Sequence, residues 1–160
     1  MIQKQNFFTV FKDSFNFARK GQFETIFPQP INDTKYYYYE SDCIVNAKVF
    51  RIGFCTGQSE VIFLEEGLPG YVKEFTLYHE VGHKELHNKL LLDTKLANKI
   101  TKERRKGSVH HMEFEADQYA VNIVGIEKSV MALRFILTIS KNKHFVNELK
   151  SRLSALERML

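Results

Sequence analysis

The chain has few of the features that stabilise small secreted scaffolds or membrane anchors. Among its 160 residues are only two cysteines, Cys43 and Cys55, and they do not form a CxxC pair. Two cysteines are too few for a disulfide framework, so we interpret both as ordinary thiols. No hydrophobic run approaches the ~18 residues that a membrane-spanning helix needs. We therefore expect a globular protein with neither a disulfide scaffold nor a membrane association.

The chain also lacks a strong excess of either charge. Lysine and arginine total 23 and aspartate and glutamate total 19, a net charge of +4. This excess is too small to indicate a nucleic-acid partner, and the basic stretch 95–106 is interpreted as a solvated helix face. The N-terminal stretch "MIQKQNFFTVFKDSFNF" has no uninterrupted apolar segment and no small-residue cleavage site. Because a signal peptide needs both, we expect a cytoplasmic protein.

What the chain does have is the composition of one folded domain. Its residues are 44% hydrophobic and 26% charged, and the length suits a single domain over residues 1–160. The Tyr36–Tyr39 run is interpreted as an aromatic strand or a packed loop, and β-rich runs predict a small antiparallel sheet over residues 42–64. Helical periodicity is found at residues 5–19, 72–90, 109–124, 126–140 and 143–159. This pattern predicts an α+β fold.

One short motif carries chemistry. The sequence "HEVGH" places His79 and His83 one turn apart on the same face of the predicted helix. Two imidazoles so placed can bind one metal ion, and zinc accepts histidine nitrogen at about 2.0–2.1 Å. Glu80 sits about 100° further round the helix, where it can reach a water molecule bound to the metal but not join the ligands. The motif therefore predicts a hydrolytic zinc site.

A catalytic zinc site needs a third protein ligand and an open fourth position. His87 continues the four-residue spacing, but three ligands on one straight helix would span about 12 Å, so we expect His87 to face solvent. The downstream stretch "HHMEFEADQYA" offers Glu113 and Asp117 on one helix face, with Glu115 pointing roughly the opposite way. One of the two carboxylates can bind the metal while the other accepts the N–H of a ligating histidine. The spacing alone does not decide which.

The pair of motifs "HEVGH" and "EFEADQYA" resembles the gluzincin metallopeptidases. This resemblance implies that His79, His83 and Glu113 bind zinc. It also implies that Glu80 is the general base and that Asp117 supports His79. The stretch "FTLYHEVGHKELH" is similar to the motif helix of soluble minigluzincins and ImmA/IrrE-type peptidases, and "EFEADQYAVNIVG" resembles HtpX-type peptidases.

The resemblance implies a zincin-like fold and a zinc-dependent endopeptidase. In that fold a small antiparallel sheet lies beside the motif helix, the glutamate helix crosses it, and C-terminal helices support both. The substrate would be a protein or peptide, and among ImmA/IrrE-type relatives it is a transcriptional repressor. His110, His111 and Tyr71 are open candidates to assist the oxyanion, and the strand "EVIFL" is a candidate to pair with the substrate.

A second function class stays open. The chain could be a zinc-containing module that binds a partner protein without cleaving it. Glu80 argues for catalysis, because a purely structural metal site does not need a carboxylate at that position.

Overall fold

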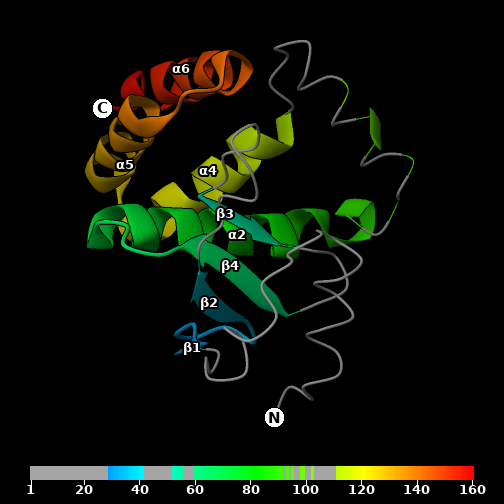
Figure 1. Cartoon of the computed structure of the whole chain (residues 1–160). Coiled ribbons are helices and arrows are strands. Elements are labelled where there is room, and N and C mark those ends of the chain that lie inside the picture. Colours follow the sequence, from blue (N-terminus) through cyan, green and yellow to red (C-terminus); the bar gives the residue numbers. More distant parts are fainter. Residues whose placement is uncertain are drawn as a thin grey trace.

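The computed structural model describes residues 29–41, 52–55, 60–91, 93, 95, 98–99, 102 and 111–160. The predicted helix 5–19, Cys43, His110 and most of the basic stretch lie outside these residues. Within them, a small sheet packs against one long helix, two further helices pack on that helix, and a last helix packs on those two (Figure 1). The predicted α+β class is confirmed.

The sheet has four described strands in the order β1-β2-β4-β3. Their bounds are β1 (Gln29–Pro30), β2 (Tyr37–Ser41), β3 (Gly53–Cys55) and β4 (Val61–Glu65). The tyrosine run thus contributes a strand, and the Tyr39 ring stacks on Phe63 with ring centroids 6.0 Å apart.

The expected antiparallel sheet is wrong in one pairing, because the sheet is mixed. β1 pairs with β2 and β3 pairs with β4 in antiparallel fashion, but β2 and β4 run parallel. After β2 the chain crosses to the far edge to form β3, and β4 then returns between them. Because β3 runs opposite to β2, a β4 strand that is antiparallel to β3 runs parallel to β2.

The central strand β4 reads "VIFLE", and its first four residues are buried. A continuous apolar run of this kind is typical of a strand covered on both faces. On one face Ile62 and Leu64 pack against Val81 of the long helix. This contact attaches the sheet to the helix that carries the HEVGH motif.

The described helices are α2 (Gly70–Leu91), α4 (His111–Val124), α5 (Ile126–Ile139) and α6 (Lys143–Glu157). They agree with the predicted ranges within a few residues at each end. Gly125 has a φ of 89°, a left-handed conformation that glycine adopts easily, and it ends α4 as predicted. The Asn142 side chain caps α6 by accepting from the backbone N–H groups of His144 and Phe145.

In Figure 1, α2 lies between the sheet and α4; α5 packs on both α2 and α4, and α6 packs mainly on α5. The main apolar cluster joins Val72 and Phe75 of α2 to α4, α5 and α6. Tyr71 packs against this cluster, with its ring edge-on to Phe135 at a centroid distance of 6.4 Å.

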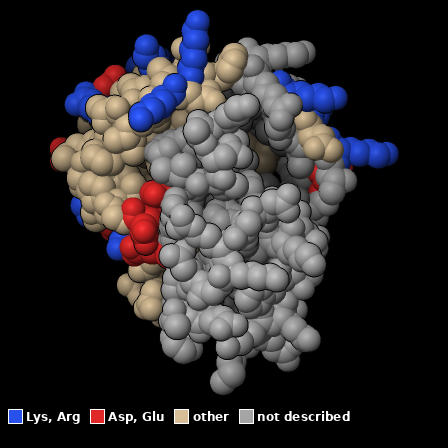
Figure 2. Space-filling model, viewed as in Figure 1, with Lys and Arg blue, Asp and Glu red and all other residues tan. Residues whose placement is uncertain are grey.

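The charged side chains of the described surface are unevenly distributed in the view of Figure 2. Basic side chains lie along the top, over α6, and acidic ones lie lower on the left.

Candidate metal centre

Helix α2 presents His79 and His83 on its buried side. They are one turn apart, their side chains are almost fully buried, and their Nε2 atoms lie 3.1 Å from each other. The two rings meet edge to face, with centroids 4.7 Å apart. The helical spacing read from the sequence therefore does bring both imidazoles to one point.

A close crossing of two helices brings the third group to that point. Gly82 lies between the two histidines in the chain, and a Cβ on it would lie 3.1 Å from Ala116 Cα and 2.9 Å from Tyr119 Cβ. Such distances are shorter than normal carbon–carbon contacts of about 3.5–4.0 Å. Only glycine on α2 facing alanine on α4 allows this approach, and it places Glu113 beside the histidines.

His79, His83 and Glu113 form a buried group whose ligand atoms lie within 4.8 Å of one another. The Glu113 oxygens lie 3.4 Å from His79 Nε2 and 3.5 Å from His83 Nε2. In a tetrahedral zinc site with bonds of about 2.0–2.1 Å, ligand atoms are about 3.3–3.4 Å apart. The three observed separations thus lie close to the edge lengths of that tetrahedron. The group could hold a metal ion.

Hydrogen bonds behind His79 orient its ring. Its Nδ1 lies 2.7 Å from Asp117 Oδ1, so the N–H at Nδ1 donates to the carboxylate, and in the neutral ring the lone pair is on Nε2. Arg152 from α6 then donates from Nε to Oδ2 at 2.7 Å and from Nη2 to Oδ1 at 2.6 Å. Asp117 lies beside His79 as expected. The sequence patterns did not identify Arg152 as part of this network.

A second chain of hydrogen bonds orients His83 and passes through His87. His87 was expected to face solvent, and that expectation is wrong, because only 4% of it is exposed. Its Nε2 donates to Glu115 Oε2 at 2.8 Å, which leaves Nδ1 as an acceptor 3.2 Å from His83 Nδ1. His83 therefore donates from Nδ1, and its Nε2 lone pair faces Glu113.

The buried charges around the site are unbalanced, and a bound cation would compensate them. The buried carboxylates of Glu113, Asp117 and Glu148 surround one buried guanidinium, that of Arg152. With His79 neutral, as metal binding requires, three negative charges and one positive charge leave a net charge of −2 in this cluster. Buried charge is costly unless it is compensated, and one divalent cation would neutralise the cluster.

The pKa of His79 responds to the same surroundings. Burial and the Arg152 charge both lower the pKa of His79, but its contacts with the Asp117 and Glu113 carboxylates outweigh them and raise it to about 9. Burial raises the pKa of Asp117, but the Arg152 and His79 charges hold it below its usual value. Without a metal, protons therefore compete for the ligand histidine up to alkaline pH.

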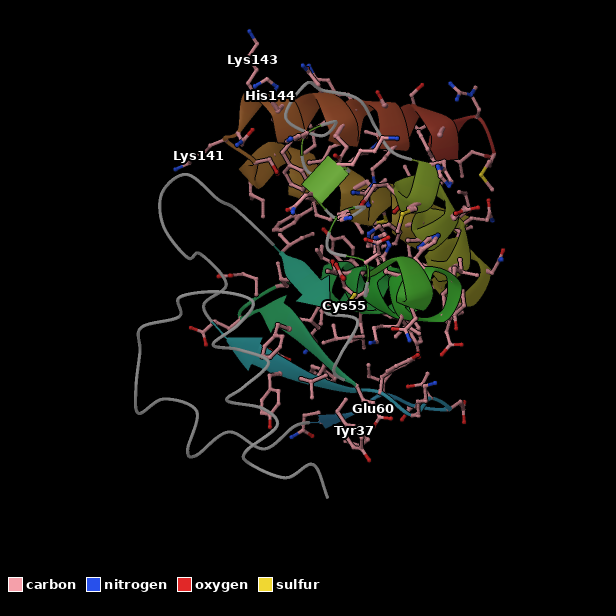
Figure 3. All side chains as sticks on the ribbon, turned by 90° about the vertical axis from the view of Figure 1, so that its right-hand side faces the viewer. Tyr37, Cys55, Glu60, Lys141, Lys143 and His144 are labelled. Carbon is pink, nitrogen blue, oxygen red and sulfur yellow. The ribbon has the colours of Figure 1, made fainter. Side chains whose placement is uncertain are left out.

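Glu80 lies next to the metal group on α2 and is also buried. It faces Cys55 at the end of β3, which Figure 3 places beside α2. Burial raises the pKa of the Cys55 thiol, and the Glu80 and Glu113 charges raise it further. Cys55 thus lies within electrostatic reach of both the predicted base, Glu80, and the third member of the metal group, Glu113.

Tyr71 and His111, the other described candidates from the sequence, are not members of the metal group. Tyr71 packs in the apolar cluster of α5, away from the metal group, and His111 is exposed at the first turn of α4. His87 had a usable sequence signal, since it follows His83 at the same four-residue spacing as His83 follows His79. No local signal marks Arg152, because its hydrogen-bond partner Asp117 is on another helix, α4.

No protein-family model matches the chain, and neither does any curated protein or solved structure. Among the described residues, none of the helices combines the length and the apolar character required to cross a bilayer.

Proposed function

We propose that this protein is a zinc-dependent endopeptidase with His79, His83 and Glu113 as the zinc ligands and Glu80 as the general base. The observation that carries the proposal is the geometry of the metal group. Three donors approach the spacing of a zinc tetrahedron, and Glu80 of the same motif is buried against Cys55, which is also within electrostatic reach of Glu113.

The donor set favours zinc over harder divalent ions. Two imidazole nitrogens and one carboxylate are typical of catalytic zinc sites, whereas calcium and magnesium favour sites made of oxygen. In the neutral form of each histidine the remaining proton is on Nδ1, which donates to Asp117 or His87, so the lone pair is on Nε2. These hydrogen bonds select the tautomer that metal binding needs, and the metal displaces the second proton of His79.

A zinc ion at this site would act as a Lewis acid that polarises a peptide carbonyl and makes a water molecule acidic. Glu80 accepts a proton from the attacking water and returns it to the amine that leaves. Asp117 and His87 hold the two ligand histidines in place during this exchange. The burial of Glu80 keeps the proton transfer away from bulk solvent.

Strand β3 is the better candidate to bind an extended substrate. The expected strand, β4, is paired on both sides and cannot accept another. In the described sheet β3 is an edge strand, and its last residue, Cys55, faces Glu80. A peptide that pairs with β3 would pass close to the base by β-augmentation. The substrate suggested by the resemblance is a transcriptional repressor.

The metal assignment is tested by zinc content. Purified wild type should retain about one zinc per chain, whereas Glu113→Ala should lose most of it because two ligands remain. Glu127→Ala, on the exposed side of α5, is the matched control and should keep its zinc. Full zinc content in Glu113→Ala would show that the third ligand lies elsewhere.

The catalytic assignment is tested by comparing wild type with Glu80→Gln. This variant should keep its zinc and cut peptide bonds about 10²–10⁴-fold more slowly, because it lacks the general base. New protein N-termini are then compared in cells that express each form. Cuts found with wild type alone would establish a peptidase and identify its substrate. Matching profiles with full zinc content would instead favour a metal-containing binding module.

A further inference from the structure

The buried Arg152 is not explained by the proposed hydrolysis alone. It lies on α6, far along the chain from both motifs, and only 5% of it is exposed. Its guanidinium reaches from α6 into the space between α4 and α2. A buried guanidinium is costly unless each of its donors has an acceptor, so its contacts show what holds it there.

Two of its nitrogens bind one carboxylate. Nε donates to Asp117 Oδ2 and Nη2 donates to Asp117 Oδ1, at 2.7 and 2.6 Å. This two-point contact fixes the plane of the carboxylate as well as its position. Asp117 Oδ1 also accepts the N–H of His79, whose Nδ1 lies 3.4 Å from Arg152 Nη2. The direction in which His79 points is thus set through Asp117 by Arg152.

The third nitrogen faces the metal group directly. Nη1 lies 3.4 Å from Glu113 Oε2 and 3.7 Å from Glu148 Oε1. Glu148 is one turn before Arg152 on α6 and holds the guanidinium from its own helix. Arg152 therefore contacts two carboxylates of α4, those of Glu113 and Asp117.

We propose that Arg152 is a positioning residue that holds the Glu113 carboxylate in place to bind the metal and the Asp117 carboxylate in place to orient His79. It acts on His79 through Asp117 and does not touch the substrate. The last described helix is thereby part of the metal site, because the planar fork of Arg152 holds two carboxylates of α4 at once. Lysine has no such fork and cannot make the same set of contacts.

This inference rests on the proposed metal site, but its test needs no hydrolysis. Wild type, Arg152→Lys and Arg152→Met are compared for zinc affinity by competition with a chelator. The visible absorption spectrum of the cobalt-loaded protein reports ligand geometry in parallel. Arg134→Met is the matched control, since Arg134 also contacts a glutamate, Glu157, but on the exposed surface.

We expect both Arg152 variants to bind zinc about 10–100-fold more weakly and to shift the cobalt spectrum, and Arg134→Met to do neither. Should Arg152→Met fail to fold, Arg152→Lys decides, because it keeps the buried charge. In a protein that already carries Asp117→Asn, Arg152→Lys should weaken zinc binding by a smaller factor than it does in the wild type, because the two residues act together.

Wild-type zinc affinity and an unchanged cobalt spectrum in Arg152→Lys would overturn the inference. A wild type that binds zinc but cuts no peptide would contradict the peptidase and leave the role of Arg152 standing. The two failures are therefore distinguishable.

Discussion

Replacing Gly82 by alanine should loosen both the helix crossing and the metal site. The added Cβ would lie 2.9 Å from Tyr119 Cβ, 3.1 Å from Ala116 Cα and 3.2 Å from the Ala116 carbonyl oxygen. The contacts with Ala116 are to backbone atoms, which cannot rotate away. To restore contacts of about 3.5–4.0 Å, α4 must move by roughly 0.5–1 Å relative to α2.

The size of the effect follows from two opposing contributions. Overpacking of this kind destabilises by about 1–3 kcal/mol, and the better helix propensity of alanine offsets up to about 1 kcal/mol. The net loss of about 0–2 kcal/mol should lower the melting temperature of the metal-free protein by up to roughly 8 °C. A zinc site tolerates ligand displacements of only about 0.2 Å, so a movement of Glu113 with α4 should weaken zinc binding by at least about tenfold.

The assay measures thermal unfolding of the metal-free protein and zinc affinity by chelator competition. Gly70→Ala is the matched control, because Gly70 is also in α2 and a Cβ there meets nothing within 4 Å. Gly70→Ala changes helix propensity without adding a close contact, so it should lower neither the melting temperature nor the zinc affinity. The reasoning is refuted if Gly82→Ala melts as high as Gly70→Ala and binds zinc as tightly as wild type.

Three further predictions concern the hydrogen-bond network and one turn. His87→Phe removes the acceptor of the His83 N–H and should weaken zinc binding about 10–100-fold in chelator competition; unchanged affinity would show that His87 only fills space. The pKa of His79 is raised from 6.5 to about 9. Since the folded metal-free protein then holds a proton that the unfolded chain releases, its free energy of unfolding should fall by about 3 kcal/mol between pH 6.5 and 9. Denaturant unfolding at a series of pH values checks this, and a rise instead of a fall would contradict it. Gly125→Ala should destabilise by about 1–3 kcal/mol, because alanine is strained at a φ of 89°; a melting temperature equal to wild type would show that the α4–α5 turn adapts.

The structure agrees with the sequence most closely where the signal is local. The four-residue spacing of His79 and His83 becomes a shared helix face because α2 is continuous over that stretch. The end of α4 at Gly125 follows from the backbone preference of one residue. Such features depend on the periodicity and torsion angles of adjacent residues, which a single sequence contains.

The sequence was less informative about pairing and burial. The parallel pairing of β2 with β4 depends on where β3 is inserted, and the alternation of side chains along a strand does not encode its neighbours. His87 was expected in solvent because helical geometry places it two turns from His79. It is buried because α4 covers that turn of α2, and Glu115 of α4 is its partner.

By itself, then, the sequence determined which residues could bind a metal, since ligand type and helical spacing are properties of short segments. Tertiary structure alone decided how those residues are supported. Gly82 matters because Ala116 of another helix lies against it, and Arg152 matters because α6 docks where its guanidinium can reach Asp117. The physical reason is that a supporting contact depends on the distance and crossing angle between helices, which the pattern of either helix alone does not contain.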